Sequence, residues 1–435
     1  MKNDLNEFAT PASLNNITLT SKVFNSRCYP WLVVFMSCLF LFYKYIVQVS
    51  PSVMTGELMR HFNLQATGLS EMVAFYFPAY CVTQFLAGPL LDRYSTRLLS
   101  CLALLLMSFS LFEFSQSSQL WEAYLWRLLM GVGAAFATVS YLKLVAVWFD
   151  ERKFSYVAGW LATAASVGGM IAQTPVAMSV QRVGWQHTLY LCSLVGVVVA
   201  CVYGLLVRSE NPMNQGPAGA VNVKTSMQQV KSLFKSKRLW LLALYSGLAW
   251  APLAVFSGLW GDSFLQVAYH LTKTQAASLV TLTFAGLATG GPLFGWLANR
   301  LNQVMSMMLL GLLLSLFGLS YVLFVPFTSM LFVSVALFLF GLGTGAFMLG
   351  FALGRQWFSV ALAATVIAVV NTGDALFGAF TEPMVGKLLD VYRHGMVLHG
   401  FPVYNLHSYH CAMLVLPLYL LAATFVLWLL ARMRK

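Results

Sequence analysis

The chain has 435 residues, of which 59% are apolar and only 9% are charged, and its mean hydropathy is +0.74. Soluble proteins carry roughly 25% charged residues, so this composition excludes a soluble globular domain and a disordered chain. Long apolar runs exclude an outer-membrane barrel, whose strands alternate apolar and polar residues. Because only helices and closed barrels satisfy their backbone hydrogen bonds in lipid, the composition predicts an all-α membrane protein.

Twelve segments are apolar enough to cross a bilayer, which takes about 20 residues each. In chain order they are 31–53, 69–91, 98–114, 120–148, 154–180, 187–207, 239–265, 275–298, 304–324, 329–353, 359–386 and 409–431. The long polar connection at 208–238 divides them into two sets of six. The predicted organisation is a cytoplasmic N-terminal segment (1–30), an N-terminal six-helix bundle (31–207), a cytoplasmic linker (208–238), a C-terminal six-helix bundle (239–431) and a cytoplasmic tail (432–435).

Lysine and arginine are distributed unevenly between the two sides of these spans. With the N-terminus inside, 18 of them fall on the inner side, 5 on the outer side and 3 within spans. Since basic residues accumulate in cytoplasmic loops, we predict a multi-pass protein of the cytoplasmic (inner) membrane with both termini in the cytoplasm. The same rule accounts for the net charge of +12 without a nucleic-acid partner.

The two halves carry similar segments at similar spacing. The second span ends in GPLLDR at 88–93, and the eighth ends in GWLANR at 295–300, 207 residues later. The fourth span holds GVG at 131–133, and the tenth holds GLG at 341–343, 210 residues later. This spacing predicts an internal six-span duplication. Glycines at this depth favour close helix packing over a nucleotide-binding loop.

The loop between the second and third spans resembles the signature of the major facilitator superfamily, G-x-L-x-D-R-x-G-[RK]-[RK]. It reads GPLLDRYSTR at 88–97, with Ser95 in place of the second glycine and Thr96 in place of one basic residue. The segment RLLMGVG at 127–133 resembles the fourth-span arginine motif of the same family. With the span count, the linker and the repeat, the resemblance covers the whole chain.

This resemblance implies the fold and the mechanism of the superfamily. The implied fold is twelve transmembrane helices in two six-helix bundles with inverted repeats, and the implied mechanism is alternating access to a site at the midplane. Asp92, Arg93 and Arg97 are then expected to form a gate at the cytoplasmic side. The segment at 43–54, YKYIVQVSPSVM, is similar to the phagosomal transporter (Pht) branch of intravacuolar bacteria, which takes up amino acids and nucleosides. It is more distantly similar to the lysosomal dipeptide transporter group.

Two opposite charges lie near the middle of the predicted bilayer. Lys44 is 13 residues into the first span and Asp374 is 15 residues into the eleventh, which places both about 20 Å from the cytoplasmic edge. Charged groups are not tolerated facing lipid at this depth, so we expect both to face the interior. They form either a substrate site or a static salt bridge between the bundles.

Polar side chains at helical spacing accompany these charges. The predicted substrate-binding residues are Lys44, Gln48, Tyr76, Tyr80, Gln84, Asn371 and Asp374. Their spacings of three, four and eight residues put each set on one helix face. Polar stripes can instead join helices to each other, and for Tyr76 and Tyr80 this alternative stays open.

Other ionisable residues have simpler interpretations. Arg127, about 10 Å below the outer face, is expected either to pair with Glu113 or to act in substrate binding or coupling. Glu71, Asp262 and Glu382 fall near the outer ends of their spans, so we expect them to be solvated.

The sequence therefore predicts a secondary active transporter that moves a zwitterionic amino acid with a proton. The alternatives are a nucleoside, dipeptide, organic-anion or sugar-phosphate carrier of the same superfamily, and a non-transporting membrane receptor. The predicted partners are a small-molecule substrate, protons as coupling ion and the lipid bilayer, and the predicted state is a monomer. Coupling is assigned to Asp92, Arg93, Arg97, Arg127 and Asp374. No catalytic triad, metal-ligand spacing or nucleotide loop is found, so we expect neither enzymatic activity nor a cofactor.

Overall fold

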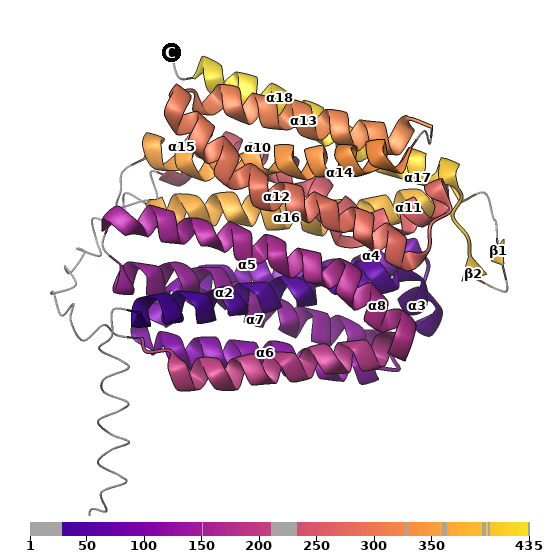
Figure 1. Ribbon diagram of the computed structural model, residues 1–435, viewed down its shortest axis with the longest axis horizontal. Helices are drawn as coiled ribbons and strands as arrows, with labels where there is room; N and C mark the ends of the chain where they lie inside the picture. The colour runs from indigo at the N-terminus through magenta and orange to yellow at the C-terminus, as the bar shows by residue number, and fades with distance from the viewer. Residues whose placement is uncertain are drawn as a thin grey trace, which may run out of the picture.

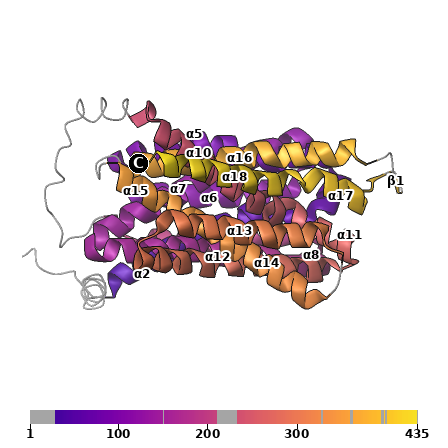
Figure 2. The same cartoon turned by 90° about the horizontal axis from the view of Figure 1, so that it is seen from above.

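The computed structural model describes residues 28–149, 151–209, 233–326, 329–358, 363–393, 397–398 and 401–433. Long helices run side by side along one axis (Figures 1 and 2). A hairpin of two-residue strands, β1 (Val397–Leu398) and β2 (Phe401–Pro402), lies at one end. Most of the predicted N-terminal segment and linker lies outside the described residues, and the domain boundaries stay predictions.

The first half of the chain forms one bundle, drawn from indigo to magenta in Figure 1. Its first span consists of α2 (Tyr29–Val49), the 3-10 turn η1 (Ser50–Met54) and α3 (Thr55–His61). The following helices are α4 (Ala66–Ala74), α5 (Tyr76–Arg93), α6 (Thr96–Gln116), α7 (Leu120–Trp148) and α8 (Glu151–Leu206). The sequence prediction for the fourth span, 120–148, coincides with α7.

The second half forms the other bundle. Its first span consists of α10 (Lys237–Val255), the π-helical turn η2 (Phe256–Trp260) and α11 (Gly261–Tyr269). The next elements are α12 (Lys273–Leu301), α13 (Val304–Phe324), α14 (Met330–Thr344), η3 (Gly345–Met348) and α15 (Leu349–Trp357). They are followed by α16 (Ala363–Val391), α17 (Leu406–Met413) and α18 (Val415–Arg432).

Helix α8 is two passes rather than one. Its 56 residues would extend about 84 Å if straight, far beyond a bilayer. The chain turns at Gly184, whose φ of 82° is a backbone conformation that glycine adopts without strain. The hydroxyls of Ser179 and Thr188 lie 2.9 Å apart across this turn, although residues nine apart in a straight helix are about 13 Å apart.

With α8 counted as two passes, the described helices can be compared with the twelve predicted spans. Within the described ranges, ten helical segments are long and apolar enough to cross a membrane, and one of them, Trp160–Leu206, is the double pass. Helix α16 has 29 residues, which is long enough to cross a bilayer, although it is not among those ten. The described residues thus contain the twelve predicted passes in two bundles.

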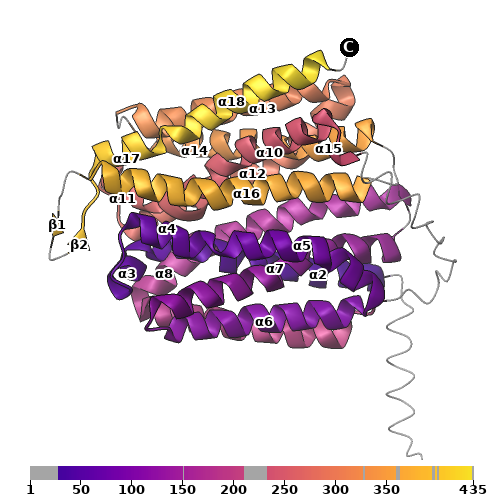
Figure 3. The ribbon, with the colours of Figure 1, turned by 180° about the vertical axis from the view of Figure 1, so that it is seen from behind.

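The two ends of the molecule differ in charge. At one end α2 begins, α18 ends, and Arg93, Arg97, Arg300 and Arg432 lie at or beside helix termini; we call it the basic end. The opposite end, with the β1–β2 hairpin, is the far end. The bundles meet where α16 lies against α4 and α5, and where α8 packs on α12 (Figure 3).

Glycine pairs show the duplication in three dimensions. A Cβ on Gly131 would overlap the Tyr76 carbonyl oxygen, and a Cβ on Gly341 would overlap that of Thr283. The fourth span thus crosses the second as the tenth crosses the eighth, with only glycine admitting the close approach. The prediction that these glycines serve helix packing is confirmed.

We expect Gly341→Ala to destabilise the protein, because one helix must move to admit the methyl group. Overpacking of this kind typically costs about 1–3 kcal/mol. Gly295→Ala is the matched control, since a Cβ there meets nothing within 4 Å and alanine favours a helix. Thermal unfolding of the purified protein in detergent measures both. An unchanged unfolding temperature in Gly341→Ala would contradict the close crossing.

Candidate functional site

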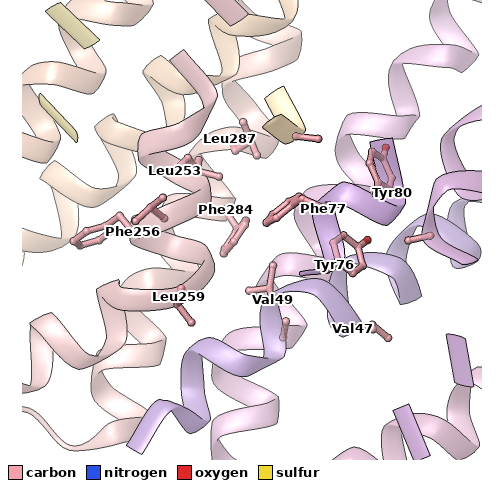
Figure 4. Packing of buried hydrophobic residues seen from close by; sticks show 14 of the residues in the cluster. Val47, Val49, Tyr76, Phe77, Tyr80, Leu253, Phe256, Leu259, Phe284 and Leu287 are labelled. Atoms are coloured by element: carbon pink, nitrogen blue, oxygen red, sulfur yellow. The ribbon is translucent and has the colours of Figure 1, made fainter. Parts of the chain in front are cut away.

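A cavity with a free volume of about 60 Å³ lies between the two bundles. We call it the central cavity. Its lining consists of Lys44, Tyr45, Gln48, Tyr76, Phe77, Tyr80, Leu161, Ala162, Ala165, Trp250, Leu287, Phe347, Met348, Asn371, Asp374 and Ala375. Figure 4 shows Phe77 of α5 pointing toward Phe284 of α12, with Tyr76 and Tyr80 on the same helix as Phe77. Both bundles therefore contribute to one site.

Lys44 reaches the central cavity from the middle of α2 and is only 5% exposed. Its ammonium lies 4.1 Å from the ring centre of Tyr45 and 5.0 Å from that of Tyr80. Aromatic faces attract a desolvated cation by about 2 kcal/mol, so the rings hold the ammonium without neutralising it. The charge stays available to an anionic group in the cavity.

Asp374 lines the same cavity from α16 and is also 5% exposed. Its Oδ1 atom has no hydrogen-bond partner. Among the described residues, no ion pair within 4.0 Å joins Asp374 to Lys44. The static salt bridge that the sequence allowed is therefore not formed in this structure. Each buried charge instead lacks an ionic partner, which is costly unless a ligand supplies one.

The other predicted site residues divide into two groups. Gln48, Tyr76, Tyr80 and Asn371 line the central cavity, and the Asn371 amide donates to the Tyr80 hydroxyl at 3.2 Å, joining the two bundles. Gln84 is buried on α5 but does not line the cavity. Sequence reasoning missed Tyr45, although it is adjacent to Lys44.

Of the two alternatives predicted for Arg127, the pairing with Glu113 is not found, and the role in substrate binding or coupling stays a prediction. It is 2% exposed and donates to the carbonyl oxygens of Val47 at 3.3 Å and Val73 at 2.9 Å. Its guanidinium lies 5.3 Å from the Tyr76 ring and interacts electrostatically with Glu382, and Glu113 is not among these partners. The possible pairing with Glu113 was wrong because α7 turns this side chain into the bundle, whereas Glu113 is partly exposed on α6.

Three acids were expected to be solvated, and of these Glu71 is exposed. Asp262 and Glu382 are instead buried, with exposed fractions of 1% and 3%. Both helices continue past the predicted span ends, α11 to Tyr269 and α16 to Val391. Glu382 thus lies nine residues, about 13 Å, before the end of its helix. Glu382 lines a second, smaller cavity next to the central one.

The far end is closed by a carboxylate that joins the bundles. Asp390 of α16 accepts hydrogen bonds from the backbone amides of Ala66 at 3.2 Å and Thr67 at 2.8 Å, and from the Thr67 hydroxyl at 2.5 Å. The Tyr404 hydroxyl donates to the same carboxylate at 2.5 Å and accepts from the Ala66 amide at 2.9 Å. Burial raises the pKa of Tyr404, which keeps this phenol protonated as a donor. A carboxylate from one bundle therefore caps the first turn of α4 in the other.

The hydrogen bonds that join described residues of the two bundles are located between the central cavity and the far end. The Thr55 and Ser263 hydroxyls are 2.7 Å apart, and the Lys273 ammonium pairs with Glu57. The Gln173 amide donates to the carbonyl oxygen of Ser257, a residue of η2, at 2.8 Å. This distribution describes a conformation closed at the far end, with the central cavity on the side of the basic end.

The signature motif lies at the basic end. Arg93 and Arg97 are exposed there, while the Asp92 side chain lies outside the described residues. The Lys143 ammonium donates to the Leu91 carbonyl oxygen at the end of α5, so it supports the helix that carries the motif. The gating role of Asp92, Arg93 and Arg97 stays a prediction.

We expect Asp92→Asn to slow transport while leaving folding largely intact, because the change removes the charge of the predicted gate near the end of α5 and keeps the size of the side chain. Initial rates in proteoliposomes, with thermal unfolding as the control, measure this effect. Wild-type transport kinetics in Asp92→Asn would show that the motif does not gate this protein.

Comparisons with known proteins agree with this architecture. Residues 31–381 match the family model of the Major Facilitator Superfamily. A probable L-galactonate transporter of Escherichia coli (strain K12) is 24% identical over 387 residues, covering 82% of this chain and 83% of the relative. A lysosomal dipeptide transporter of Danio rerio is 22% identical over 305 residues, covering 66% of this chain and 65% of the relative.

The fold also matches a solved structure. A bacterial homologue of the human lysosomal transporter Spinster, in an inward-facing and unoccupied conformation, superimposes with a TM-score of 0.76 at 14% identity. The match covers 94% of this chain and 98% of that one. The narrower resemblance to the phagosomal transporter branch stays a prediction.

Proposed function

We propose a substrate and a coupling ion for this chain, which belongs to the major facilitator superfamily and is a membrane carrier of small solutes rather than an enzyme. The proposed substrate is a small zwitterionic amino acid, and the proposed coupling ion is the proton. The observation that carries the substrate proposal is the pair of buried, opposite and unpaired charges, Lys44 and Asp374, on the wall of one cavity.

The cavity offers a partner to each end of a zwitterion. Lys44 donates to the substrate carboxylate, with Gln48 one helical turn further along α2 as a second donor. Asp374 accepts from the substrate ammonium. Each substrate charge offsets the desolvation of one buried protein charge, so the occupied site costs less than the empty one. The aromatic walls leave room only for a small side chain.

The proposed orientation in the membrane rests on the charge distribution. If the basic end faces the cytoplasm, as the excess of lysine and arginine favours, the protein lies in the inner membrane with both termini inside. The closed far end then faces outward, and in this conformation the substrate exchanges with the cytoplasm. Rocking of the bundles about the central cavity would expose the same charges to the outside.

A sugar acid is the second candidate substrate. The relative from Escherichia coli is a probable L-galactonate transporter. A hexonate would place its carboxylate at Lys44 and its hydroxyl groups at Asp374, Gln48 and Asn371, all of which line the cavity. The two candidates differ in what Asp374 binds, an ammonium or neutral hydroxyls.

A thermal-shift panel on purified protein in detergent tests the substrate proposal. The ligands are neutral amino acids, L-galactonate and D-glucuronate, a dipeptide, a nucleoside and a sugar phosphate. A ligand at 100 times its Kd stabilises the folded state by about 2.7 kcal/mol. We expect an amino acid to stabilise the wild type and not Asp374→Asn.

Two other results would change the proposal. Stabilisation by a hexonate that survives Asp374→Asn would replace the amino acid with a sugar acid. Binding without uptake into proteoliposomes would indicate a receptor rather than a transporter.

A further inference from the structure

A second cavity lies next to the central one and has a free volume of about 20 Å³. It shares the lining residues Tyr45, Gln48 and Trp250 with the central cavity. The remainder of its lining is Val49, Leu253, Ala254, Gly258, Phe284 and Glu382. Glu382 is thus a buried acid in an apolar cavity that adjoins the substrate site.

Two oxygen atoms of the residues lining this cavity have no hydrogen-bond partner among the residues that the structure describes. They are Oε2 of Glu382, a residue that is 3% exposed, and Oε1 of Gln48. Both are acceptors in these forms, so neither can satisfy the other. A buried acceptor without a donor costs about 1–3 kcal/mol, which is strong evidence that a donor belongs here.

The chemistry of the cavity selects the donor. Calcium and magnesium take six or more oxygen ligands, but most of this lining is apolar. The free volume accommodates roughly one water molecule. Protonation turns the Glu382 carboxylate into a hydrogen-bond donor, so no additional ion or ligand is needed to supply one.

We propose that Glu382 is the proton-binding residue of this transporter, and that the Gln48 amide connects it to the substrate. The protonated carboxyl donates to Gln48 Oε1, which orients the amide. The amide nitrogen then points its hydrogens at the substrate carboxylate held by Lys44. Proton and substrate therefore stabilise each other's binding through one side chain.

Arg127 is the partner of Glu382 when that carboxyl group is deprotonated. Its guanidinium interacts electrostatically with Glu382, and its Nε atom has no hydrogen-bond partner. When the proton leaves, Arg127 stabilises the carboxylate. When the proton returns, the carbonyl oxygens of Val47 and Val73 still hold the guanidinium.

The charged and titratable groups around Glu382 come from several elements. They are Arg127 on α7, Tyr45 on α2 and, just over two turns away on α16 itself, Asp374. This inference rests on the proposed amino-acid substrate in one respect. If the substrate ammonium occupies Asp374, a proton carried with the substrate needs another carboxylate. Glu382 lines the cavity that shares Tyr45, Gln48 and Trp250 with the substrate site.

The experiment observes the proton directly and needs no substrate. Infrared difference spectra of purified protein, titrated across the neutral range, record the carbonyl stretch of protonated buried carboxyl groups. We expect a titrating component that is lost in Glu382→Gln and kept in Asp374→Asn and Asp262→Asn, the two matched buried acids. Absence of that component in the wild type, or its persistence in Glu382→Gln, would overturn the proposal.

One further variant and an uptake assay complete the test. If Glu382→Gln does not fold, Gln48→Leu replaces it, because loss of the acceptor should move the carbonyl band to higher frequency. An unmoved band contradicts the amide connection.

In proteoliposomes, with the amino acid that stabilises the wild type most, Glu382→Gln should lose accumulation driven by a pH gradient and retain counterflow exchange. Retained accumulation, or loss of both activities in a folded variant, overturns the assignment. If no amino acid binds the wild type, the substrate proposal fails, while the infrared result still decides on Glu382.

Discussion

Lys44→Ala and Asp374→Asn should each abolish substrate binding, and the double variant should not restore it. Each single change removes the partner of one substrate charge and leaves the other protein charge buried and unpaired. Truncating one member of a buried charged contact costs about 2–5 kcal/mol. On the affinity scale, even the lower value is a loss of about 30-fold.

The double variant distinguishes a substrate site from a structural bridge. In a bridge, removing both charges leaves no unpaired charge and recovers much of what the single changes lose. In a substrate site, two contacts to the ligand are missing and binding stays lost. Calorimetric binding to the four proteins measures this cycle. Recovered binding in the double variant would contradict our assignment.

Gln84→Leu is the control for this cycle. Gln84 is a buried polar residue on α5, like the site residues, but it does not line the central cavity. We therefore expect near wild-type affinity in this variant. A loss as large as that of Lys44→Ala would show that any buried polar change disturbs the site.

The fold was largely predictable because a bilayer imposes strong constraints on sequence. Apolar length alone placed α7 and α13 at the observed bounds. The same constraint left helix ends uncertain, because a helix can extend beyond the lipid. Helix α16 continues to Val391, five residues past the predicted span, since its last turns pack on α4 of the other bundle.

The candidate site was predictable where depth alone determines the environment. Lys44 and Asp374 lie too deep for lipid, so they had to face the interior, and they share one cavity. Glu382 and Asp262 were missed because their burial comes from contact between the bundles at the far end. A single span contains no information on that contact. For Glu382 one signal was present, an acid just over two turns after Asp374 on the same helix.

The sequence did not predict which end of the molecule is closed in this conformation. The signature motif predicts a gate at the basic end, yet the polar contacts that join the bundles in this structure lie toward the far end. The two ends cannot both be closed if the bundles rock as rigid bodies. Contacts at the far end should therefore set the balance between the two conformations.

Asp390→Ala should shift this balance toward the conformation open at the far end. The variant loses the acceptor of two amide and two hydroxyl hydrogen bonds at the start of α4. Hydrogen bonds to a charged group are worth about 1.5–3 kcal/mol each in the net. A net loss of only about 2 kcal/mol changes a two-state ratio roughly 30-fold, because each 1.4 kcal/mol is tenfold.

Spin labels at Arg60 and Tyr392, exposed residues of opposite bundles at the far end, report this shift as a longer distance. The exposed native cysteines Cys28 and Cys201 must first be replaced. Glu57→Gln is the matched control, because it breaks the ion pair with Lys273 at the same end, where both side chains are partly solvated. Such a pair contributes about 0–1 kcal/mol, so the control should move the distribution much less. Equal distributions in Asp390→Ala and the wild type, or an equal shift in Glu57→Gln, would show that Asp390 does not hold the far end closed.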